Sequence, residues 1–297
     1  MCVIRKFLVL ILTFGLLPLG LSAAEPDTDA TTYERQIQLL GRQAALGHRL
    51  VRSMCFAQAG IDVKRNRDLV TDTRREVAAT LAALKAGDPA RGVMPITNGD
   101  ILTQLSSVEM VWNGLDKKAT AFLSDVGLSD EEVLSLESKS QSLEKLLRNV
   151  TQSLELRTSV DLPPEALMRS RLIIAGVDQS RLLQQAGMDA CLIYLDRASD
   201  TVHTRRESLA KDLQTFGTNI FNLTFTRPAQ SKGPEIPELE QAAFNTWQNW
   251  IGLEPLFQIL ITPSQRADLS MLLPDLSFSI EYMDLQLVET LDIFMAL

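Results

Sequence analysis

Few residues of this chain have the types and spacing that catalysis or metal binding requires. Its two histidines, His48 and His203, lie far apart in sequence, which leaves little for a metal site or for acid–base chemistry. Asp130, Glu131 and Glu132 form an acidic run, but carboxylates at the start of a predicted helix are favoured there by the helix dipole. The sequence contains no nucleophile elbow, phosphate-binding loop or paired Cys-x-x-Cys motif. We therefore predict that the protein is not an enzyme and holds no metal or cofactor.

The overall composition indicates an acidic, helical protein. Of 297 residues, 45% are hydrophobic and 22% are charged, and the 15 glycines and 12 prolines are too few for a loop-rich β-sandwich or a disordered chain. The 29 lysines and arginines against 37 acids give a net charge of −8 with no basic run, so nucleic acid is not an expected partner. Three cysteines are too few for a disulfide scaffold.

The first residues have the order of a secretory signal peptide. Arg5 and Lys6 precede an apolar stretch at 7–21, and small residues follow at 22–24. The apolar stretch is shorter than the roughly 20 residues of a membrane span and is interrupted by Gly and Pro. We predict that residues 1–24 are removed and that the mature protein is periplasmic and soluble. An uncleaved N-terminal anchor is the alternative.

Apolar residues at helical spacing fill the rest of the first half of the chain. They predict four helices, at Tyr33–Ala59, Val63–Lys85, Asp100–Gly127 and from Ser129 through Leu154, with a Gly/Pro loop at Gly87–Asn98. His48 lies near the apolar stripe of the first helix. We interpret it as a hydrogen-bonded histidine between helices rather than as a ligand or a proton switch.

The same plan follows a break at Ser159–Pro164. The spacing predicts helices at Glu165–Ala198, at Val202–Leu223, from Ile236 through Trp247, and from Pro263 to the C-terminus with a kink at Pro274; a loop is expected at Arg227–Glu235.

Matching residues recur in the two halves at a nearly constant offset. Trp247 follows Trp112 by 135 residues, and Cys191 follows Cys55 by 136. We therefore predict a tandem duplication, although any two four-helix segments can be brought into partial register by chance. The predicted fold class is all-α, with two tandem antiparallel four-helix bundles. Their predicted limits are residues 25–160 and 161–297.

One stretch resembles a known sensor family. Leu40–Arg49, which reads LGRQAALGHR, is similar to the AGRQRMLSQR helix that opens the PilJ-type domain, the N-terminal sensor domain of type IV pili methyl-accepting chemotaxis transducers. Nitrate/nitrite sensor kinases have a related periplasmic bundle. The helix of Trp112 and the segment Leu143–Val150 fit the same plan, and Ile174–Gly176 with Arg181–Gln185 resembles the opening box in the second half.

The resemblance implies a periplasmic sensor module, here without its own transmembrane and output regions. In the related nitrate sensors an arginine of this box reaches an anion at the dimer interface, and a guanidinium suits flat oxyanions. The corresponding position in this chain is Ala44. Arg42, Arg49 and Arg181 are then the candidate residues for a small anionic ligand. The alternative is that these arginines are solvated or ion-paired on a bundle face.

The resemblance also implies how the two halves would pack. Related sensor domains dimerise with their first helices facing each other, so a tandem duplication could fold as a pseudo-dimer within one chain. Cys55 and Cys191 occupy equivalent positions on those helices, and an exported protein meets an oxidising compartment, so a disulfide between them is one expectation. Two free thiols buried in separate cores are the other.

Two functions remain open. The first is a sensor or binding module that recognises a small ligand and signals through a membrane partner, such as a chemotaxis or pilus component. The second is a structural or adaptor protein of the envelope that binds a protein partner without a small ligand.

Overall fold

The computed structural model describes residues 26–124, 127–158, 162–196, 200–226, 237–262 and 269–296. Within those ranges the protein is all-α, as predicted, with eight α-helices and a single isolated β-bridge between Asp88 and Val93. None of the helices in these ranges has the length and apolar composition needed to cross a membrane. The expected signal peptide and the expected loop at Arg227–Glu235 lie outside the described residues.

Most helices fall close to their predicted ranges, but the third helix of the second half continues past Trp247, through Pro255, to Ile261. The first half contains α1 (Pro26–Gln58), α2 (Val63–Ala86), the short 3-10 turn η1 (Pro89–Arg91), α3 (Gly99–Leu123) and α4 (Asp130–Thr158). The second half contains α5 (Pro164–Leu195), α6 (Thr201–Phe221), the π-helical turn η2 (Asn222–Thr226), α8 (Pro237–Ile261) and α9 (Leu269–Met295).

Local chemistry explains most of these boundaries. Gly87 ends α2 with a φ of 81°, a conformation that residues with a Cβ rarely adopt. Ser129 and Glu132 begin α4 with a reciprocal capping box, in which each side chain accepts a hydrogen bond from the other's backbone N–H. The third helix ends at Leu123 rather than at Gly127, because Ser124 donates to the carbonyls of the last turn. The last helix continues through Pro274.

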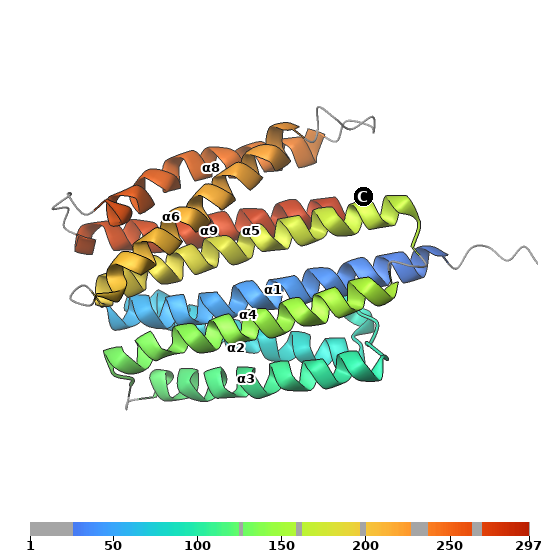
Figure 1. Cartoon of the computed structure of the whole chain (residues 1–297), viewed down its shortest axis with the longest axis horizontal. Coiled ribbons are helices and arrows are strands. Elements are labelled where there is room, and N and C mark those ends of the chain that lie inside the picture. The colour runs from blue at the N-terminus through green and yellow to red at the C-terminus, as the bar shows by residue number, and fades with distance from the viewer. Residues whose placement is uncertain are drawn as a thin grey trace, which may run out of the picture.

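The central element of the fold is α1. It packs against α2, α4 and α5, and its contact with α5 is the most extensive between any two helices. Between Tyr33 and Ala57, only Arg35, Gly41 and Arg42 are not buried. Figure 1 shows α2, α3 and α4 on one side of the α1–α5 pair and α6, α8 and α9 on the other. A single connected hydrophobic core therefore runs through both halves.

Two contacts set the register of α1 against α5. Gly41 of α1 lies directly against Val177 of α5. Further along, Cys55 and Cys191 form a disulfide with a Cα–Cα distance of 6.1 Å. Figure 1 shows both helices beginning at the same end of the molecule, so the two run parallel. The residues that any site at this seam would use are thus held by two neighbouring, co-directional helices.

Candidate functional site at the α1–α5 seam

The three arginines expected to hold a ligand do not converge on one site. Arg42 and Arg49 of α1 point toward α9 and are ion-paired there. Arg181 of α5 lies on the other side of the seam, where its ion-pair partners are Asp178 of its own helix and Glu144 of α4. The seam consequently has two faces, one bordered by α9 and one bordered by α4.

On the α9 face, Arg42 is the centre of a closed polar cluster. One guanidinium nitrogen donates to Ser180 Oγ and to Asp284 Oδ2, both at 2.8 Å, while Nε donates to Glu76 at 3.4 Å. Ser180 also donates to the second oxygen of Asp284. Burial alone would raise the pKa of Asp284, but the charge of Arg42 and the hydrogen bond from Ser180 lower it. The Asp284 carboxylate therefore stays ionised and occupies the Arg42 guanidinium.

About two turns further along α1, a single carboxylate serves two arginines. Glu281 of α9 accepts hydrogen bonds from Arg49 and from Arg52, the latter at 2.6 Å. The Arg52 side chain is fully buried, and burial lowers its pKa. Its Nε and one of its terminal nitrogens have no hydrogen-bond partner. Because removing Glu281 would leave a buried cation unpaired, this contact is structural.

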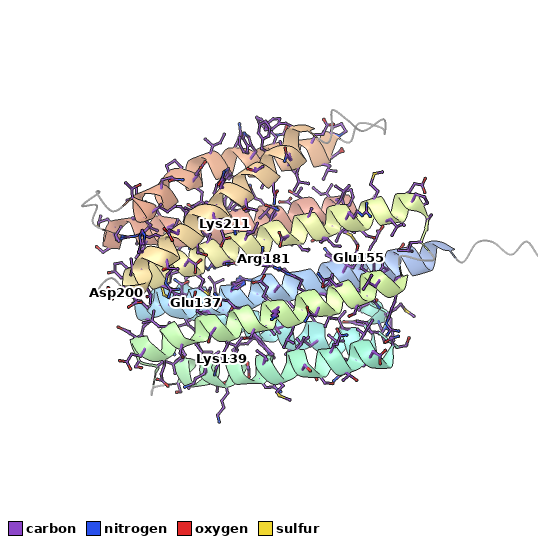
Figure 2. All side chains as sticks on the ribbon, in the orientation of Figure 1. Glu137, Lys139, Glu155, Arg181, Asp200 and Lys211 are labelled. Carbon is purple, nitrogen blue, oxygen red and sulfur yellow. A yellow bond between two sulfur atoms is a disulfide. The ribbon has the colours of Figure 1, made fainter. Side chains whose placement is uncertain are left out.

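On the α4 face the seam is open. A groove of about 260 Å³ runs between α1, α4 and α5. Its floor is apolar and its rim is charged, and the lining residues are Ile37, Leu40, Gly41, Ala44, Glu144, Leu147, Arg148, Thr151, Gln152, Glu155, Ile174, Val177, Asp178 and Arg181. Figure 2 labels Arg181 near the middle of the molecule and Glu155 toward the end where α1 and α5 begin. Ala44 lies in this groove.

Glu144 organises one end of the groove. Its carboxylate is paired with Arg148 of its own helix and lies 3.4 Å from a terminal nitrogen of Arg181. It also accepts a hydrogen bond of 2.9 Å from His48 Nε2. Burial by itself would raise the pKa of Glu144, but the hydrogen bond from His48 and the charge of Arg181 lower it to about 2. Arg181 further donates to Asp178 and Gln185, each at 2.7 Å, so Nε and one terminal nitrogen of its guanidinium are engaged within the protein.

His48 is the hydrogen-bonded histidine that the sequence predicted. Its Nδ1 lies 2.7 Å from Ser140 Oγ, which completes a Ser140–His48–Glu144 chain. These are the residue types of a hydrolase triad, but Ser140 is 1% exposed and does not line the groove. A substrate carbonyl has no route to this hydroxyl, so the chain joins α1 to α4 rather than forming a nucleophile.

The opposite end of the groove is lined by Glu155, and the buried Tyr33 lies near it behind the groove lining. Among the described residues, Glu155 makes no hydrogen bond and no ion pair. The Tyr33 hydroxyl is buried and also lacks a hydrogen-bond partner. Burial and, after it, the nearby charge of Glu155 raise the pKa of Tyr33 above its ordinary value. Among the described residues, no cation therefore pairs with the Glu155 carboxylate at this end of the groove.

A second depression, of about 860 Å³, lies between α2 and α3. Four of its charged residues form ion pairs with each other, Arg74 with Asp116 and Lys85 with Glu109, and the exposed Arg75 pairs with Asp72 outside the lining. In the part of the chain that the structure describes, no group of three or more His, Cys, Asp or Glu residues could hold a metal ion. The groove on the α4 face is thus the best candidate for a ligand site.

Sequence reasoning missed the acidic partners of the arginines. Glu281 and Asp284 lie among the buried apolar residues of α9. Their signal in the sequence was a charged residue at a helical position where the spacing predicts a buried apolar one. The comparisons with known proteins add no assignment, since no protein-family model, curated protein or solved structure matches the chain.

Proposed function

We propose that the chain folds as two tandem antiparallel four-helix bundles packed as a pseudo-dimer. The α1–α5 pair is the first support. Gly41 contacts Val177 and Cys55 is bonded to Cys191, and the partners of both pairs are 136 residues apart. Two parallel helices related by a local two-fold axis along their length bring equivalent residues together in this way.

The fourth helix of each half gives the second support. At an offset of 137 residues, buried positions of α4 match buried positions of α9: Leu136 with Leu273, Ser140 with Ser277, Leu143 with Ile280 and Val150 with Leu287. Glu144 and Glu281, which hold the polar clusters on the two faces of the seam, are related by the same offset. A duplicated bundle predicts this common register.

On that architecture, the protein is an exported, periplasmic sensor or binding module of the PilJ type that recognises a small ligand and signals through a membrane partner of the chemotaxis or pilus kind. The observation that carries this proposal is the open groove where α1 and α5 meet α4. A ligand there would contact both halves at once and could change how they pack. The proposal includes no catalytic step.

A thermal-shift screen of the mature protein tests this function. The panel contains nitrate, nitrite, sulfate, phosphate, short carboxylates, amino acids and small amines. A compound that binds only the folded protein raises the melting temperature with concentration. Thr151→Trp, which fills the groove from its half-exposed rim, should abolish the shift. A panel that leaves the melting temperature unchanged would count against a small-ligand function.

An adaptor function is the second candidate, and an exposed aromatic cluster favours it. Phe221, Phe225 and Phe244 are 46%, 39% and 39% exposed. Phe225 stacks edge-on against Trp247 with ring centroids 5.7 Å apart. An envelope protein that co-purifies with the wild type, but not with Phe225→Asp, would favour the adaptor if no compound of the panel binds.

A further inference from the structure

The two faces of the seam are built from equivalent positions, but only one face is filled. Arg42 of α1 corresponds to Asp178 of α5, and Asp284 of α9 corresponds to Leu147 of α4. On the α9 face the Arg42 side chain enters the space between the helices and is held by Asp284. On the α4 face Asp178 accepts a hydrogen bond from Arg181 of its own helix instead. The groove is the volume that no internal side chain fills.

The far end of the two faces differs in the same way. On the α9 face Gln38 of α1 donates a hydrogen bond of 3.0 Å to Asp292 of α9. Their equivalents on the α4 face are Ile174 of α5 and Glu155 of α4. The isoleucine side chain has no hydrogen-bond donor. Among the described residues, Glu155 therefore has no hydrogen-bond partner, whereas the equivalent Asp292 accepts a hydrogen bond from Gln38.

The charges of the groove point to the kind of ligand that fits. Its five charged residues are three carboxylates and two arginines. Both arginines are paired with Glu144, and Arg181 also with Asp178. An anion at either arginine would lie beside Glu144 and be repelled by it, whereas a cation at Glu155 displaces no partner among the described residues.

We propose that the groove binds a small organic cation, with its ammonium group at Glu155 and an apolar body along Ile37, Leu40 and Ile174. This inference rests on the proposed ligand-binding function and names the ligand class. From Glu144 to Glu155 the groove follows 11 residues of α4, or about 16 Å of helix, which accommodates a six-carbon chain with its head group. The ligand takes the place that Gln38 and Arg42 take on the other face.

Three probes with one tail and different charges test the proposal. Hexylammonium, hexanoate and hexan-1-ol are titrated into the mature protein by calorimetry, with melting temperature as a second measurement. Hexylammonium should bind about tenfold more tightly than hexanoate, because only the ammonium gains a charge-assisted hydrogen bond. Glu155→Gln should weaken hexylammonium binding by about tenfold and leave hexan-1-ol unchanged.

Asp292→Asn is the matched control, since it neutralises the equivalent carboxylate on the filled face. It should leave all three affinities as they are. Equal or tighter binding of hexanoate, or a Glu155→Gln variant that binds hexylammonium like the wild type, would overturn the cationic class. If Thr151→Trp still abolishes binding of the preferred probe, the groove remains a ligand site and only its charge preference was wrong. No binding of any of the three probes would reject the organic-cation class, while the thermal-shift panel decides separately whether the groove binds another small ligand.

Discussion

Gly41 lies so close to Val177 that a Cβ atom added to Gly41 would be 2.8 Å from Val177 Cβ. Real Cβ atoms essentially never approach other carbon atoms this closely, so the position has room for glycine alone. The gap allows the backbone of α1 to approach the side chain of α5, four helical turns from the Cys55–Cys191 bond. This close packing of α1 against α5 thus depends on the absence of a methyl group at Gly41.

Gly41→Ala should destabilise the protein by about 1–3 kcal/mol through overpacking, despite the better helix propensity of alanine. Combining it with Val177→Gly removes the side chain of α5 that the new methyl group of α1 would meet. The double variant should lose less free energy of unfolding than the sum of the two single variants. Urea denaturation of all four proteins measures this coupling, and strictly additive losses would mean that the two positions do not touch.

The Cys55–Cys191 disulfide should be fully formed in protein exported to an oxidising compartment. It closes a loop of 136 residues, for which the chain-entropy model gives a stabilisation of about 5 kcal/mol. Reduction, or the Cys55→Ser/Cys191→Ser variant, should therefore lower the melting temperature strongly. Alkylation of denatured but unreduced protein, followed by intact mass measurement, decides the matter. Two alkylated cysteines in that sample would exclude the bond.

Glu281→Leu should cost about 3–5 kcal/mol, because it leaves the buried Arg52 without its carboxylate. Replacing both residues in Arg52→Leu/Glu281→Leu should recover only part of that loss, because Arg49 also loses this carboxylate. Asp72→Ala serves as the control, since its ion pair with Arg75 is largely exposed and should contribute less than about 1 kcal/mol. Chemical denaturation gives all three values. A Glu281→Leu protein as stable as the control would contradict the buried pairing.

Acid should weaken the protein through Glu144. Its pKa is about 2 in the folded protein against an ordinary value of 4.5, so the folded state binds the proton less tightly than the unfolded state. The stability it contributes, up to about 3 kcal/mol, is therefore fully present above pH 4.5 and is lost as the pH falls toward 2. Stability measured between pH 6 and 2.5 should fall less steeply for Glu144→Gln than for wild type. Glu131→Gln, at an exposed position, should follow the wild-type curve.

The N-terminus of the mature protein should begin near Glu25, because small residues follow the apolar stretch at the positions that a signal peptidase reads. N-terminal sequencing of protein from the periplasmic fraction of the native host tests this. Intact Met1 in the membrane fraction would show that the segment is a permanent anchor.

Helix positions were predictable because their signals are local. Glycine at Gly87 and the Ser129–Glu132 capping box need only the residues around them, and the structure places boundaries at both. The third helix was predicted too long, since Gly127 is a strong stop signal and Ser124, which actually ends it, is a weak one.

The candidate site was less predictable because its partners are distant in sequence. Arg42 and Arg49 could be identified as candidate residues, but the carboxylates that occupy them lie 242 and 232 residues further along the chain. Helical periodicity says which face of α1 is apolar and nothing about which helix covers it. The free carboxylate in the groove was also hidden from sequence reasoning. Ile174 lies opposite Glu155 and offers it no hydrogen-bond donor, and this difference from the other face is recognised only when the two halves are compared.

The covalent bond between α1 and α5 also limits how the two helices can move relative to each other. Cys55 and Cys191 lie about one turn from the C-terminal ends of their helices, whereas the groove residues Ile37 to Ala44 lie several turns toward the N-terminal ends. A piston motion, in which one helix slides past the other, would have to stretch the bond. A scissor motion that pivots at the bond would leave the bond unstretched. A ligand bound in the groove, several turns from this pivot, would push the N-terminal parts of the two helices apart.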